Sequence, residues 1–162
     1  MVERFPMAVE DVSAIAARTA PAAWSRVSYD NGCLVVPDDL APVFAALDIA
    51  ELRKQRLRDR ALARRRDLLS RPITVGGRRT WVDNGTRLDV ELLSREFQSV
   101  AFKFVDGFAT VTAPELARIG RAITHYVAGV FANESTVHAG IEAGTITSDA
   151  ELDAVWPPQP RE

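Results

Sequence analysis

The chain has 162 residues, a formal net charge of −2, 47% hydrophobic residues and 26% charged residues. This composition is typical of a folded globular protein and excludes an intrinsically disordered chain. Cys33 is the only cysteine, which excludes an internal disulfide and any zinc site built on two or more cysteines. Since no run of about 18 apolar residues is present, we expect no membrane-spanning helix. The acidic residues near Met1 argue against a signal peptide.

The near-neutral total hides an uneven distribution of charge. Residues 51–80 hold 11 basic and 3 acidic residues, a net charge of +8, whereas the rest of the chain carries −10. Of the 20 basic residues, 18 are arginine, the side chain best suited to bidentate pairing with carboxylates and phosphates. The middle of the chain could therefore meet an acidic partner, nucleic acid, or the acidic remainder of its own fold.

The first 47 residues are interrupted by four prolines. The pattern predicts a short helix at about residues 10–19, a turn at 29–32, a short strand at 33–36 and a second short helix capped by Asp38. We expect little core within this segment and interpret it as an attachment arm.

Residues 48–51 have the spacing of a helix capping box, with an acceptor at Asp48 and a carboxylate at Glu51. They predict a helix of roughly 20 residues that ends before Pro72. It carries the basic residues Arg53, Arg56, Arg60, Arg64, Arg65 and Arg66. At about 100° per residue these side chains surround the helix, which favours pairing with acidic segments, within the chain or across subunits, over a one-sided nucleic-acid surface.

Two hairpins are predicted after this helix. Gly76-Gly77 separates residues 73–75 from 80–82, and a bulged turn that places Ile73 beside Trp81 fits the apolar pattern best. Asp106-Gly107 predicts a two-residue turn that pairs Phe104 with Ala109 and Phe102 with Val111. Between the hairpins, a helix starting near residue 86 would carry Leu88, Leu92, Leu93 and Phe97.

The last third of the chain predicts a long helix that begins at a capping box, residues 112–115. Steps of three and four residues, close to three heptads, define a seam of Leu116, Ile119, Ile123, Tyr126, Val130, Asn133 and Val137. The seam is either the core face of a helix packed on the hairpins or the contact of a homo-oligomer, a dimer or trimer, in which Asn133 would set the register.

Gly140 and Gly144 loosen or end this long helix, and a third capping box at residues 148–151 starts a short helix that stops at Trp156. We therefore predict an α+β fold: an arm at 1–47, a module at 48–157 with two hairpins and two long helices, and a C-terminal tail at 158–162.

No pattern of catalytic or metal-binding residues stands out. The two histidines, His125 and His138, are 13 residues apart, whereas helical ligand pairs are usually 3 or 4 apart. No Gly-x-Ser-x-Gly nucleophile elbow is present. We expect no enzymatic activity, no cofactor and no metal.

Several short motifs carry a resemblance that begins at about Arg58 and ends at Pro157. They are Arg64-Arg65-Arg66-Asp67-Leu68-Leu69, the Gly-Gly hairpin followed by Trp81 and Asp83, the Asp106-Gly107 hairpin, Val111-Thr112-Ala113-Pro114-Glu115-Leu116-Ala117-Arg118-Ile119-Gly120-Arg121-Ala122-Ile123, His125-Tyr126-Val127, Phe131, Glu134, Ile141-Glu142-Ala143-Gly144 and Trp156-Pro157. In these motifs the chain resembles an uncharacterised domain family of phage and prophage tail-associated proteins.

The resemblance implies a small α+β module in a tail fibre, tail tip or baseplate, and it transfers no catalytic residue. We expect a non-enzymatic structural component of the virion tail, attached to neighbouring tail proteins through residues 1–47, oligomeric and not inserted in a membrane. Whether it also supports host-receptor binding is left open. The alternative is a basic-helix module that binds nucleic acid.

Overall fold

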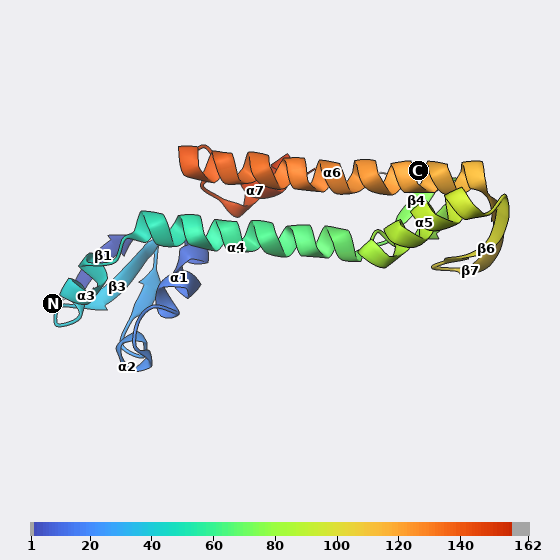
Figure 1. The fold of residues 1–162 in the computed structure, drawn as a ribbon. Helices are drawn as coiled ribbons and strands as arrows, with labels where there is room; N and C mark the ends of the chain where they lie inside the picture. The colour runs from blue at the N-terminus through green and yellow to red at the C-terminus, as the bar shows by residue number, and fades with distance from the viewer. Residues whose placement is uncertain (1, 157–162) are drawn as a thin grey trace. The chain divides into compact units, whose positions relative to one another are not determined.

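A computed structural model describes residues 2–156 of the chain (Figure 1). It is 58% helical and 20% strand, which confirms the predicted α+β class. The chain divides into two compact units, Met1–Asp59 and Arg60–Glu162, called unit 1 and unit 2 below. Each is described by itself.

Unit 1 contains a three-stranded antiparallel sheet in the order β1-β3-β2, formed by Val2–Pro6, Cys33–Pro37 and Ser28–Asp30. The predicted strand is confirmed as β3, and the turn before it is confirmed at Asn31 and Gly32, both at positive φ. Tyr29 and Asp30, which were predicted in the turn, instead belong to β2. Strand β1 is not predictable from the sequence pattern, because four of its five residues are exposed and show no apolar alternation.

Three short helices complete this unit: α1 at Val9–Ala16, α2 at Pro21–Trp24 and α3 at Ala41–Ala45. The prediction that Asp38 caps the last helix is wrong. The N-cap residue of α3 is Leu40, whose backbone N–H donates to the carbonyl of Pro37 in a turn at 2.9 Å. This turn places the helix start two residues beyond the aspartate.

Unit 1 has a core of its own, contrary to expectation. The buried members are Met7, Ile15, Leu34, Val36 and Phe44. The rings of Phe5 and Trp24 lie against Phe44, with centroids 6.4 and 5.9 Å away. Because each fully buried aliphatic or aromatic side chain contributes about 1.5–3 kcal/mol, these few residues can hold a small sheet and its helices together.

Helix α4 extends over Ile49–Ser70, as predicted. Its cap is confirmed, since the backbone N–H of Glu51 donates to Asp48 Oδ1 at 3.0 Å. The boundary between the two units falls inside this helix, at residues 59 and 60, and not at residues 47 and 48 where the arm was expected to end. The first turns of α4 belong to unit 1 because Ile49 and Leu52 pack against its core.

In unit 2, the first hairpin pairs β4, Ile73–Val75, with β5, Arg78–Thr80. The predicted bulge is wrong: Ile73 lies opposite Thr80, and the turn has only two residues. Gly76 and Gly77 both adopt positive φ, 59° and 75°, the conformation that a tight hairpin turn requires and that two glycines adopt without strain. Thr80 is therefore buried, and Trp81 is 42% exposed.

The second hairpin pairs β6, Ser99–Phe104, with β7, Gly107–Thr112. Its predicted register is wrong by two residues, because Phe102 lies opposite Ala109 and Phe104 opposite Gly107. A slip of two keeps the same side chains on the buried face, so the apolar pattern could not separate the two registers. The hairpin is also held to β5, since Val105 N–H donates to the Arg79 carbonyl at 2.9 Å.

Helix α5 covers Asn84–Glu96 and is capped by Asp83, whose Oδ1 accepts from Thr86 N–H at 2.8 Å. Val90 is its buried residue, whereas Leu88 and Leu92 are 59% and 58% exposed. The helix thus keeps two large apolar side chains away from the core.

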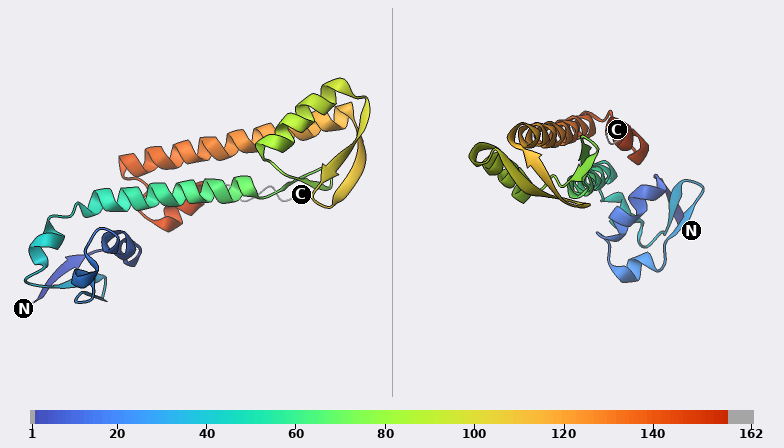
Figure 2. Two further views of the ribbon diagram at one scale, coloured as in Figure 1. Left: turned by 60° about the horizontal axis from the view of Figure 1, so that its bottom comes forward. Right: turned by 90° about the vertical axis from the view of Figure 1, so that its right-hand side faces the viewer.

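Helix α6, Ala113–Ala143, begins at the predicted capping box and ends at Gly144, which adopts a left-handed conformation. Helix α7, Asp149–Val155, begins at the box of Ser148 and Glu151. Figure 2 shows α5 and the β6–β7 hairpin both lying against the first half of α6. Side chains from these elements, from β4 and from the segment between β5 and α5 form the core of unit 2: Ile73, Val82, Val90, Phe102, Phe104, Val111, Leu116, Ile119, Ile123 and Val127.

Substitutions at two glycines of α6 test how closely α5 packs against this helix. A Cβ added at Gly120 would lie 3.0 Å from Val90 Cγ1, whereas one added at Gly129 would meet nothing within 4 Å. We expect Gly120→Val to lower the free energy of unfolding by about 1–3 kcal/mol through overpacking. The control Gly129→Val should stay within about 0.5 kcal/mol of the native chain, because valine is no worse than glycine in a helix. Equal effects in urea unfolding would contradict the close contact.

The two capping boxes should make helix stability depend on acid pH. Hydrogen bonds from the backbone N–H and hydroxyl of Thr112 lower the pKa of Glu115, and those from Thr147 and Ser148 lower the pKa of Glu151. Because both pKa values are lower in the folded chain, the stabilisation is present above the ordinary value of 4.5 and is lost as pH falls through the folded values. Carboxyl NMR titration should show both midpoints below 4.5. Thr112→Val should raise the midpoint of Glu115 and leave that of Glu151 unchanged.

Candidate functional site

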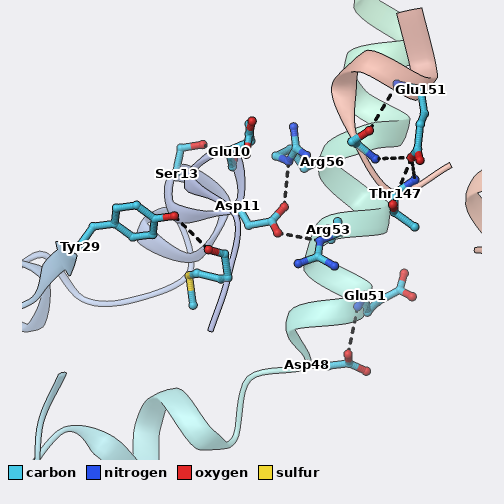
Figure 3. Close-up of polar contacts among 12 residues, drawn as sticks. Glu10, Asp11, Ser13, Tyr29, Asp48, Glu51, Arg53, Arg56, Thr147 and Glu151 are labelled. Atoms are coloured by element: carbon cyan, nitrogen blue, oxygen red, sulfur yellow. Dashed lines mark hydrogen bonds and ion pairs between the residues drawn. The ribbon is translucent and has the colours of Figure 1, made fainter. Parts of the chain in front are cut away.

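The basic residues of α4 are the first candidate site, and in unit 1 they bind one buried carboxylate. Arg53 Nε lies 2.7 Å from Asp11 Oδ2, and Arg56 Nε lies 3.1 Å from Asp11 Oδ1 (Figure 3). The Asp11 side chain is only 1% exposed. A buried carboxylate requires such partners, because an uncompensated charge in this position is strongly destabilising. These two arginines therefore hold α1 against α4.

In unit 2 the arginines of α4 bind acidic residues far along the chain. Arg60 lies 2.9 Å from Asp149 and 2.7 Å from Asp153 of α7. Its hydrogen bond to Asp153, together with the charges of both aspartates, raises the pKa of the Arg60 guanidinium. Arg65 lies 2.8 Å from Glu134 of α6, whose side chain is 12% exposed.

Arg64 and Arg66, the remaining two predicted residues of the basic helix, differ in their carboxylate partners. Arg64 lies 3.4 Å from Asp67 on the same helix. Arg66 is exposed, and among residues 2–156 it has no carboxylate partner. Five of the six predicted arginines thus pair with carboxylates of this chain, which leaves little of the basic helix available to phosphates.

The predicted seam of α6 contributes to packing inside the chain. Leu116, Ile119 and Ile123 are buried in the core of unit 2. Val130 and Val137 are also buried, at 4% and 0% exposure. The first half of the seam is therefore the core face of the helix, while its role in a homo-oligomer stays a prediction.

The two polar seam residues have different surroundings. Tyr126 packs against the core of unit 2, and its hydroxyl donates to the Leu68 carbonyl at 3.1 Å. Burial raises the pKa of this hydroxyl. Asn133 is half-buried. The tyrosine thus connects the two long helices within unit 2.

A groove between α5 and α6 is a further candidate site, which the sequence analysis did not predict. It has a volume of about 620 Å³ and is open to solvent. One wall carries Arg87, Leu88, Glu91 and Arg95 of α5, and the other carries Gly120, Arg121, Thr124 and His125 of α6. The sequence pattern that indicates one wall of the groove is the spacing of three and four residues among positions 84, 87, 88, 91, 94 and 95, which places these side chains on one side of α5.

The charged side chains of this groove are only partly paired. Arg95 lies 2.7 Å from Glu91. Arg87 and Arg121 form no ion pair with any carboxylate of residues 2–156. The groove therefore presents, beside an exposed leucine, two guanidinium groups that form no ion pair within the described part of the chain.

The histidines do not form a metal site with other side chains. His125 lines the groove. His138 lies 13 residues further along the same helix and is half-buried. Among residues 2–156, no three His, Cys, Asp or Glu side chains gather where they could hold a metal ion. In the same range, no helix combines the length and the apolar character needed to cross a membrane.

Comparisons of the chain with protein-family models, with curated proteins and with solved structures found no match.

The buried Asp11 should contribute more stability than an exposed ion pair of the same unit. We expect Asp11→Asn to lower the free energy of unfolding by about 3 kcal/mol, because it leaves Arg53 and Arg56 without their carboxylate. Asp39→Asn, which breaks an exposed pair with Arg26 at 2.8 Å, is the control and should have a much smaller effect. Equal losses in urea unfolding followed by circular dichroism would show that burial of Asp11 adds nothing.

Proposed function

We propose that this chain is a non-enzymatic structural component of a bacteriophage or prophage tail, located in the virion and joining neighbouring tail proteins. The observation that carries the proposal is the division into two units with separate cores, each with exposed apolar side chains. Such an arrangement suits a protein that contacts different partners through different surfaces. The resemblance to tail-associated domains, which covers almost all of unit 2, supports the same role.

Unit 1 is the proposed attachment region, in place of a simple arm. It exposes Val2, Val9 and Val43 by 55%, 59% and 50%. Exposed large apolar side chains are common on soluble proteins when they occur singly, but they contribute most of the contact area when a partner covers them. A small folded unit can present them in a defined arrangement, which a flexible arm cannot.

The nucleic-acid alternative is less well supported by the contacts of α4. Nonspecific binding to nucleic acid depends on basic groups that are free to neutralise phosphates. Five of the six predicted arginines instead pair with carboxylates of the chain, and two of them share one buried aspartate. If the alternative holds, DNA retention will fall with salt and will be lost on replacing Arg64, Arg65 and Arg66 by alanine.

Incorporation into particles tests the proposed role. We expect the tagged full-length chain to purify with tails from an induced host that carries its prophage. Val9→Glu combined with Val43→Glu should reduce incorporation at least about tenfold, because charge on these exposed residues opposes apolar contact.

The matched control combines Ala22→Glu and Ala45→Glu, which adds the same charge at exposed small residues of unit 1. It should be incorporated like the native chain. Absence of the native chain from purified tails would overturn the structural role. Unchanged incorporation of the double valine variant, with circular dichroism showing a normal fold, would overturn attachment through these residues.

A further inference from the structure

We propose that the groove between α5 and α6 is the docking site for an acidic, amphipathic helix of a neighbouring tail protein. The proposal rests on the proposed function, because it names the chemical class of one partner of the tail component. It is carried by the open groove between the two helices, by the exposed Leu88 in its lining, and by Arg87 and Arg121, which form no ion pair with a carboxylate of residues 2–156.

The walls of the groove are two helices in close contact. Val90 of α5 approaches Gly120 of α6 so closely that an added Cβ would lie 3.0 Å from its Cγ1. The space of about 620 Å³ lies along both helices and is open to solvent. An open groove between two packed helices can accept the apolar face of a third helix.

Apolar surface is available at this groove. Leu88 lines it and is 59% exposed, and Leu92, one turn further along α5, is 58% exposed. Both lie on a helix whose buried residue is Val90, so neither is needed by the core of unit 2. A partner helix with leucine or similar side chains every three or four residues would cover them.

The charge of the groove selects an acidic partner. Arg87 and Arg121 stand on opposite walls and have no carboxylate partner among residues 2–156, unlike most arginines of α4. Glu91 is the acidic side chain of the lining, and it is paired with Arg95 at 2.7 Å. Carboxylates on both sides of an incoming apolar face would meet these two guanidinium groups.

A second copy of this chain fits the groove less well than another protein does. The acidic helix of this chain is α7, but Asp149 and Asp153 already pair with Arg60, and Glu151 accepts the capping hydrogen bonds of its own helix. Nucleic acid also fits less well, because an exposed leucine beside only two arginines without an ion pair among residues 2–156 offers little to a phosphate backbone.

The test uses the full-length protein and a synthetic helical peptide of about 18 residues with leucine every three or four positions and flanking glutamates. Fluorescence anisotropy of the labelled peptide should show saturable binding. Arg87→Gln combined with Arg121→Gln should weaken binding at least about tenfold, and Leu88→Gln at least about threefold.

Two matched variants serve as controls. Arg66→Gln removes an exposed arginine of α4, and Phe108→Gln removes a side chain of β7 that is 73% exposed. Both should bind the peptide like the native chain. Because all of these positions are exposed, circular dichroism should show that every variant keeps the native fold.

Four results would overturn the proposal: no binding of the peptide, equal loss in the control variants, equal binding of a peptide with lysine in place of glutamate, or equal binding of an oligonucleotide. Self-association of the native chain that disappears in the double arginine variant would instead assign the groove to a second copy. If the chain is found in tails but the peptide does not bind, only the groove proposal fails. If the peptide binds but the chain is absent from tails, only the tail assignment fails.

Discussion

The structure depends on arginines of one helix that bind carboxylates distant in sequence. Asp11 is buried and has two arginine partners on α4. Removing either the carboxylate or the arginines would leave an uncompensated charge between α1 and α4, which is destabilising. In unit 2, the same helix binds Asp149 and Asp153 of α7 and Glu134 of α6. Arginine suits this role because its planar guanidinium stays charged and can contact two carboxylate oxygens or two carboxylates at once.

This use of arginine also separates two populations of basic residues. Those on α4 mostly contribute to the fold, whereas Arg87 and Arg121 lie in a groove without a carboxylate partner among residues 2–156. Overall composition and net charge cannot distinguish the two, because both populations count equally. Only the partners of each guanidinium identify which charges are available for another molecule.

The sequence predicted the elements that depend on local signals. The helices α4, α6 and α7 and their N-caps at Asp48, Thr112 and Ser148 follow from side chains three residues apart, and the structure confirms them. The hairpin registers were not predictable, because a slip of two residues preserves the buried face and a Gly-Gly turn fits more than one loop length. The core of unit 1 was also missed, since its buried residues come from short segments whose contacts are all distant in sequence.

The candidate site was predictable only in part. The spacing of the α4 arginines indicated pairing with acidic segments but could not identify Asp11 or Glu134 as partners. The groove required knowledge of how α5 and α6 pack, because its two walls come from helices that are separated by a hairpin. The seam on α6 was read correctly as apolar, yet sequence could not tell whether the chain itself or another copy covers it.

The contact between Gly120 and Val90 has a consequence for how α5 can evolve. A Cβ at residue 120 would lie 3.0 Å from Val90 Cγ1, so α5 approaches α6 here more closely than a side chain at residue 120 would allow without a shift of Val90. The orientation of α5 therefore depends in part on the absence of a side chain at residue 120. Arg87, Leu88 and Leu92 on the outward face of α5 are exposed and contribute nothing to the core of unit 2, so substitutions there change the chemistry of the face without repacking the core.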